Sequence, residues 1–244
     1  MDFILFGVTI KEAVWVPLAS AGAGGALALL GSFGATWQAN NSARKTREEA
    51  LEQQSAERAY ATFFKLFEAH NSAANLKRQI EEMFDSAAER GAADMEPWAK
   101  VMELVGAPDE IGKIEPSETS FLIAEKKAVL LNEVHLIQRR IANIMASAEK
   151  YSEVRAELHA FLMANMSHGE LAEGTQLSAA FEGTAALHAG MLEVRANSLL
   201  GQIMDFLETD VKKSWQVASE FKDAASERFG DKFPEFKIDM QMTG

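Results

Sequence analysis

The sequence predicts an all-α protein, in which a single N-terminal transmembrane helix is followed by an elongated antiparallel bundle of three long helices plus one short helix. Three observations predict this fold class. Residues 13–37 contain no charged side chain, apolar residues recur at helical spacing through the rest of the chain, and no stretch shows the alternation of a β-strand. The predicted divisions are an extracytoplasmic leader (1–12), the transmembrane helix (13–37), a cytoplasmic helical bundle (38–229) and a C-terminal tail (230–244).

The uncharged segment 13–37 has the length of a membrane-spanning helix. About 20 apolar residues are needed to cross a hydrocarbon layer of ~30 Å at ~1.5 Å per residue. Trp15 and Trp37 bracket the segment, and indole rings favour the headgroup level. Basic residues are concentrated after the segment rather than before it, which predicts the plasma (inner) membrane with the C-terminal body in the cytoplasm. These residues are Arg44, Lys45 and Arg47 after the segment and Lys11 before it.

Two other interpretations of this segment stay open. A cleaved signal peptide is compatible with the small residues Ser32 and Gly34, although the leader lacks the basic start that such peptides carry. A buried core helix would also be apolar on all faces. The preceding stretch 3–10 is too short to span a bilayer as a helix, so we expect it to lie in the outer interface or to extend the anchor.

Small residues recur every four positions in the predicted anchor. Such spacing lets two helix backbones approach closely in lipid, which predicts self-association or docking to another membrane helix. Glycine and alanine are also simply common in membrane helices. The transmembrane packing residues predicted on this basis are Ser20, Ala21, Gly24, Gly25, Ala28, Gly31 and Ala35.

The composition excludes several classes of partner and cofactor. The net charge is −12, whereas nucleic-acid binders normally present a basic face, so we expect no nucleic-acid partner. The absence of cysteine excludes disulfides, thiolate metal sites and cysteine nucleophiles. We expect no cofactor and identify no small-molecule ligand. The expected partners are the membrane lipid bilayer and either further copies of the chain or a helical protein.

The bundle begins with one long helix. Residues 43–89 contain neither proline nor glycine and carry apolar residues three and four apart. Residues 91–117 hold three of the five prolines, which predicts a bundle crossover with a short helix over 96–105 that has Pro97 in its first turn. The tail contains Phe233 and Phe236, which we expect to dock back on the body.

A heptad repeat predicts that the next helix, opened by Ser117, packs against partner helices. The steps alternate between four and three residues over more than four heptads, and only Arg155 interrupts the apolar seam. The seam comprises Leu130, Val134, Ile137, Ile141, Ile144, Ala148, Tyr151, Arg155, Leu158 and Leu162.

The last long helix is expected over residues 176–228 and carries two stripes. A bulky stripe includes Leu187, Met191 and Ile203, and a small stripe includes glycines at heptad-like spacing. Glycine inside a helix costs about 1 kcal/mol relative to alanine, so its recurrence predicts close packing of a neighbouring helix. The helix-packing residues predicted in this way are Gly183, Gly190 and Gly201.

No constellation of residues predicts catalysis or metal binding. Glu133 and Glu157 stand two residues before His135 and His159, whereas a di-metal bundle uses a spacing of three. The remaining candidate pair is Arg155 with His159, which share a helix face. This pair resembles the Arg–His motif of the HEPN class of helical ribonucleases, although its spacing is one residue shorter and nothing else in the chain is similar.

The sequence therefore predicts a single-pass membrane-anchored helical protein that acts by protein–protein interaction, as a scaffold, an assembly factor or a signalling spacer. It is not expected to be an enzyme. Two alternatives remain: a membrane-tethered helical hydrolase or nuclease that uses Arg155 and His159, and a pore-forming or lysis-type membrane protein. The absence of any ionisable residue within 13–37 gives no support to an ion relay.

Overall fold

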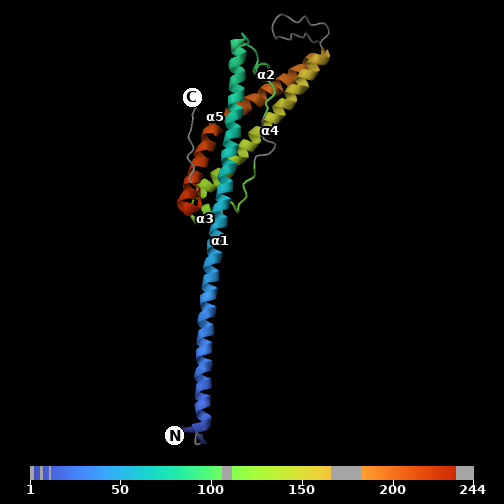
Figure 1. The fold of residues 1–244 in the computed structure, drawn as a ribbon. Coiled ribbons are helices and arrows are strands. Elements are labelled where there is room, and N and C mark those ends of the chain that lie inside the picture. The colour runs from blue at the N-terminus through green and yellow to red at the C-terminus, as the bar shows by residue number, and fades with distance from the viewer. Residues whose placement is uncertain (1–2, 6–7, 11, 106–111, 166–182, 235–244) are drawn as a thin grey trace. The chain divides into compact units, whose positions relative to one another are not determined.

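A computed structural model describes residues 3–5, 8–10, 12–105, 112–165 and 183–234 (Figure 1). Within the first long helix, side chains are described at Ser32 and from Thr36 onward. The chain divides into two units, Met1–Gln54 and Ser55–Gly244. The described elements are β1 (Phe3–Leu5), β2 (Val8–Ile10), α1 (Glu12–Glu89), α2 (Pro97–Lys100), α3 (Ser120–Ala124), α4 (Ala128–Asn165), α5 (Thr184–Phe229) and the 3-10 helix η1 (Gly230–Lys232).

The first unit contains a short hairpin and the beginning of α1. β1 and β2 pair antiparallel, with Phe3 opposite Ile10 and Leu5 opposite Val8. The prediction that no stretch forms a strand is therefore wrong here, because strands of three residues are too short to display an alternation. Apart from this hairpin the elements are helical, which confirms the all-α class and the helical bundle.

α1 is continuous through residues 13–37, and Asn40 and Asn41 lie inside it. No helix in the part of the chain that the structure describes is long and apolar enough to cross a membrane. The side chains of residues 1–31 and 33–35 lie outside that description. The transmembrane assignment of residues 13–37 and the seven packing residues predicted within it remain predictions.

The second unit is a bundle of α1, α4 and α5 around one apolar core. α5 runs antiparallel to both other helices, because residue numbers fall along α5 as they rise along α1 and α4. α1 and α4 consequently run in the same direction, so the prediction that consecutive long helices are antiparallel holds only for α4 and α5. The contacts that show these directions are His70–Ser214, Lys77–Glu208, Lys127–Glu227 and Arg140–Asp210.

The parallel direction of α1 and α4 results from the connector between them, which returns along the bundle (Figure 1). At one end of the connector, the backbone N–H of Trp98 donates to Asn197 Oδ1 of α5 at 2.9 Å. At the other end, Lys65 Nζ of α1 donates to the carbonyl of Lys113 at 2.7 Å and pairs with Glu118 at 2.9 Å. The segment is a crossover, as predicted, but only Pro97–Lys100 of the expected helix 96–105 is helical.

Tyr151 of α4 fixes the middle of this connector. Its hydroxyl is buried and donates to the carbonyl of Val101 at 2.6 Å. Burial raises the pKa of Tyr151 to about 12, so the phenol remains a donor across the physiological range. Val101 itself is fully buried, and its carbonyl therefore requires this partner.

The heptad prediction for α4 is confirmed. Its seam residues from Leu130 to Leu158 are buried, except Arg155, and Leu162 packs at the margin of the core. The helix does not begin at Ser117, however. Lys126 has a positive φ of 56°, which ends α3 and turns the chain into α4. The predicted docking of Phe233 is also confirmed, because it is buried against Tyr60 and Phe63 of α1.

The stripe assignment for α5 is wrong in part. Of the predicted bulky stripe, Ile203 is buried, whereas Leu187 and Met191 are exposed. The buried side of the first half shares only Ile203 with the three named members of that stripe, because α5 carries apolar residues on two faces and periodicity does not choose between them. That buried side comprises Ala189, Leu192, Ala196, Leu200 and Ile203.

Candidate functional site

The first half of α5 presents an apolar surface on the side opposite the core. Leu187, Met191 and Val194 are 67%, 64% and 69% exposed. A helix on a protein surface normally places polar residues opposite its core face, and a helix that is apolar on both sides is normally covered on both. We call this surface the apolar outer face. It comprises Ala186, Leu187, Gly190, Met191 and Val194.

The second half of α5 shows what an ordinary surface of this helix looks like. Eighteen residues make five full turns at 3.6 residues per turn, so positions eighteen apart point in the same direction. Asp205 points in the same direction as Leu187, Glu208 in the same direction as Gly190, and Lys212 in the same direction as Val194. All three are exposed. At these three positions the same side of one helix thus changes from apolar or neutral to charged along its length.

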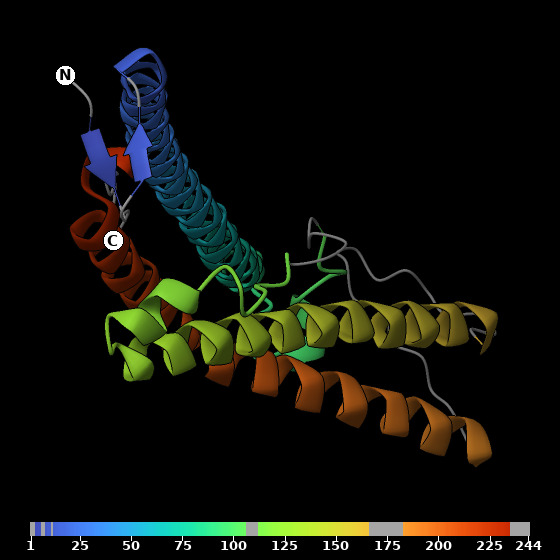
Figure 2. The ribbon, with the colours of Figure 1, turned by 90° about the horizontal axis from the view of Figure 1, so that it is seen from below.

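A shallow hollow of about 850 Å³ lies against the apolar outer face. α4 and α5 lie side by side here in both views (Figures 1 and 2), and the hollow extends from α5 to Lys150 of α4. Lys150 is already paired with Glu153. The lining residues are Lys150, Ala186, Leu187, Gly190, Met191, Val194, Arg195, Ser198 and Leu199.

Opposite charges border the two sides of this face. Glu193 and Arg195 flank Val194 in sequence, and two residues correspond to 200° around a helix. Burial and repulsion by the nearby carboxylate of Glu96 raise the pKa of Glu193. Arg195 forms no hydrogen bond or ion pair with any residue that the structure describes. The face therefore has an unsatisfied acidic side and an unsatisfied basic side.

Among the described residues, no neighbouring helix packs closely against the three glycines predicted for helix packing. A Cβ at Gly183, Gly190 or Gly201 would meet nothing within 4 Å. Gly183 is not inside the helix but precedes it, with a positive φ of 61°. Gly190 and Gly201 face away from the core, so close packing of a neighbouring helix on them remains a prediction. At Gly190 the open space is part of the apolar outer face.

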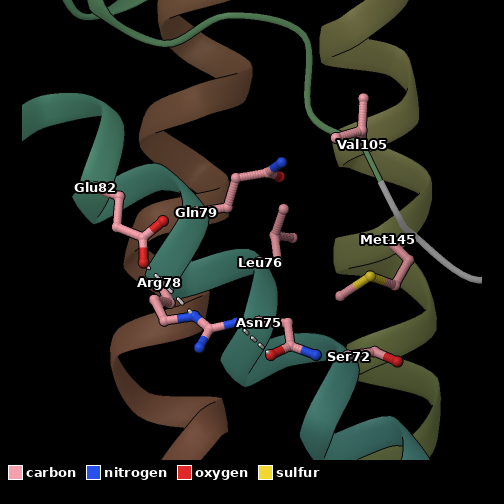
Figure 3. Close-up of a pocket in the computed structure, with 8 residues that line it drawn as sticks. All are labelled: Ser72, Asn75, Leu76, Arg78, Gln79, Glu82, Val105 and Met145. Atoms are coloured by element: carbon pink, nitrogen blue, oxygen red, sulfur yellow. Dashed lines mark hydrogen bonds and ion pairs between the residues drawn. The ribbon is translucent and has the colours of Figure 1, made fainter. Parts of the chain in front are cut away.

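A second, polar hollow of about 320 Å³ lies between α1, the connector and α4 (Figure 3). Figure 3 shows Leu76 and Gln79 of α1 facing Val105 and Met145. Gln79 Oε1 is buried and accepts no hydrogen bond from the described residues. Ordered water can satisfy such an acceptor, so the hollow has the chemistry of a hydrated crevice.

Arg78 and Glu82 at the mouth of this hollow neutralise each other. Their closest atoms, Nε and Oε1, are 3.8 Å apart, and Arg78 also donates to Asn75 Oδ1 at 3.3 Å. Among the described residues, no group of three or more histidine, aspartate or glutamate side chains is placed to hold a metal ion. The apolar outer face of α5 is the stronger candidate for a binding surface.

Of the candidate nuclease pair, His159 is exposed, whereas Arg155 is engaged with the connector. Arg155 Nε donates to the carbonyl of Trp98 at 3.1 Å, and its guanidinium lies 5.2 Å from the Trp98 ring centre. Arg155 therefore holds the connector on α4. His159 is exposed one turn further along α4.

The sequence analysis missed the apolar outer face because it assigned these residues to the packed faces of α5. The charged residues on the same side of the second half of α5 were the signal that could have revealed it.

The chain matches no known protein-family model, no curated protein and no solved structure at a significant level.

Proposed function

We propose that this chain is a single-pass membrane-tethered helical protein that acts by binding another protein, as a scaffold, an assembly factor or a signalling spacer. One observation carries the binding part of the proposal: the apolar outer face of α5 opposes a complete core face on the same helix. Contiguous exposed apolar surface of this kind marks interaction sites. The second half of α5 carries charged residues on the same side, which indicates that the apolar residues of the first half form a local binding surface.

The tether is supported by the sequence of residues 13–37, which lack any charge, and by the basic residues that follow. Alkaline carbonate extraction of cells that produce the full chain tests it. We expect the intact protein to remain in the membrane pellet. Replacing Leu27 and Leu30 together by lysine should release it, because each lysine costs about 3 kcal/mol at the centre of a membrane helix.

Two results of the extraction would overturn the tether. Intact protein in the supernatant would show that residues 13–37 do not anchor the chain. A shorter soluble product would show that they form a cleaved signal peptide, and the proposed cytoplasmic location of the body would fall with the tether.

The binding part is tested by placing a charge on the apolar outer face. Val194→Glu should abolish cross-linked complexes in membranes without changing the melting temperature of the chain, because Val194 is exposed. Gln216→Glu is the matched control, since it adds the same charge to the exposed side of the second half of α5. Equal cross-linking of both variants and the unaltered chain would contradict a binding role for the face.

A further inference from the structure

We infer that the occupant of the apolar outer face is a second copy of this chain, bound with the two α5 helices parallel about a two-fold axis. The inference rests on the proposed function, because it names the partner of the face proposed there. It is argued from the charges that border the face and from the neutral strip between them.

The charge pattern selects both the partner and its direction. Glu193 and Arg195 lie on opposite sides of Val194. When two identical helices pack parallel about a two-fold axis, the left side of one helix meets the right side of the other. Arg195 of each copy then faces Glu193 of the other copy. An antiparallel pair would instead bring like charges together, since its symmetry joins identical sides.

Both charges lack such a partner within one copy. Arg195 forms no ion pair with the described residues. Burial and repulsion by the carboxylate of Glu96 raise the pKa of Glu193. Asn197 Nδ2 donates to Glu96 Oε2 at 3.1 Å and so holds that carboxylate in place. A guanidinium from a second copy would supply the missing cation.

The strip between these charges is neutral and has the spacing of a helix–helix contact. Leu187, Gly190 and Val194 follow one another at steps of three and four, so they lie along one side of the helix. No atom of the described residues lies within 4 Å of a Cβ built at Gly190, so a second backbone can approach closely there. The chain carries a net charge of −12, and a neutral strip is where two copies repel each other least.

The proposed tether also favours a contact between two copies. Confinement to a membrane raises the effective concentration of one copy around another. A contact of a few helical turns would be weak between proteins in solution, but it is then sufficient to hold two copies together.

The absence of cysteine in the chain makes disulfide formation a direct test of the pairing. In full-length protein in membranes, Val194→Cys should form a disulfide-linked dimer under mild oxidation, because a parallel two-fold axis sets residue 194 opposite its own copy. Lys212→Cys is the matched control and should stay unlinked, since it has the same direction on α5 but lies in the charged half. Equal linking at both positions would overturn the inference.

Charge reversal then tests the predicted contact between the copies. In the Val194→Cys background, Arg195→Glu should lower the rate of dimer formation roughly fivefold, which corresponds to the upper range for exposed ion pairs. Adding Glu193→Arg to that variant should restore the rate, because the exchanged charges again face each other. A double variant as slow as Arg195→Glu alone would show that the two residues do not meet.

Three further outcomes separate this inference from the proposed function. Linking only when Leu187→Cys and Val194→Cys chains are mixed would show an antiparallel pair and overturn the parallel one. A monomeric chain that still forms Val194-dependent complexes with other proteins would overturn the inference and leave the proposed function standing. A cysteine-linked dimer in protein that carbonate releases would support the pairing and refute the tether.

Discussion

Arg140 of α4 and Asp210 of α5 form a two-pronged ion pair across the helix interface. Nη2 lies 2.8 Å from Oδ1, and Nε lies 2.9 Å from Oδ2. The carboxylate side chain is only 3% exposed, whereas the arginine is 42% exposed and its guanidinium lies 5.6 Å from the ring centre of Phe206. The arginine thus neutralises a charge that the core has removed from water.

Replacing the arginine should therefore cost more than losing an ordinary surface ion pair. Arg140→Met would leave Asp210 buried without its cation, and we expect a loss of about 3 kcal/mol in the free energy of unfolding. Urea denaturation measures this change. Arg139→Met, at the exposed neighbouring position, is the control and should change stability by less than about 0.5 kcal/mol. Similar losses in both variants would contradict the role given to the pair.

The sequence predicted the seam of α4 because each buried residue there is apolar and falls on one heptad. It did not predict the position of Asp210, because a charged residue on a core face breaks the very pattern by which cores are recognised. The spatial neighbour Arg140, seventy residues away, makes that burial tolerable. The apolar outer face was missed for the complementary reason. Its exposed leucine, methionine and valine carry the same periodic signal as a core.

Two glycines should respond to alanine with opposite signs. Gly201 is an exposed position inside α5, and a Cβ there would meet no atom of the described residues within 4 Å. Gly201→Ala should therefore raise the free energy of unfolding by about 1 kcal/mol. Gly230 ends the same helix with a positive φ of 54°, which alanine adopts poorly, so Gly230→Ala should lower it by about 1 kcal/mol. Thermal denaturation of the two variants checks both signs. A loss at Gly201 would mean that another helix does pack there.

The corner between α3 and α4 was predicted as uninterrupted helix because nothing in its composition marks a break. Lys126 is exposed, and its φ of 56° is a left-handed conformation in which lysine is disfavoured. Lys126→Gly should therefore stabilise the chain by about 1 kcal/mol. Lys126→Ala separates the two possible causes, since it removes the charge but keeps the Cβ. An equal gain from alanine would assign the effect to charge instead of backbone strain.

His70 of α1 should make the bundle less stable in mild acid. Its Nδ1 lies 3.0 Å from Ser214 Oγ, and its ring lies 5.3 Å from that of Trp215. Burial lowers the pKa of His70 below its ordinary value of 6.5. A hydrogen bond to the Val211 backbone raises the pKa, but by less than burial lowers it. Below pH 6.5 the unfolded chain consequently binds more protons than the folded chain, so stability is fully present above that pH and falls as the pH is lowered.

His70→Asn should flatten this part of the pH profile, because asparagine keeps a polar group near the position of Nδ1 but does not titrate. The free energy of unfolding is measured by urea denaturation between pH 7.5 and about 5. His159→Gln is the matched control, since His159 is exposed on α4, and it should retain the slope of the unaltered chain. Carboxylates contribute to acid sensitivity in every variant, so the difference between the two histidine variants reports on the buried imidazole. Identical slopes in both would show that His70 is as free to take up a proton in the folded bundle as in the unfolded chain.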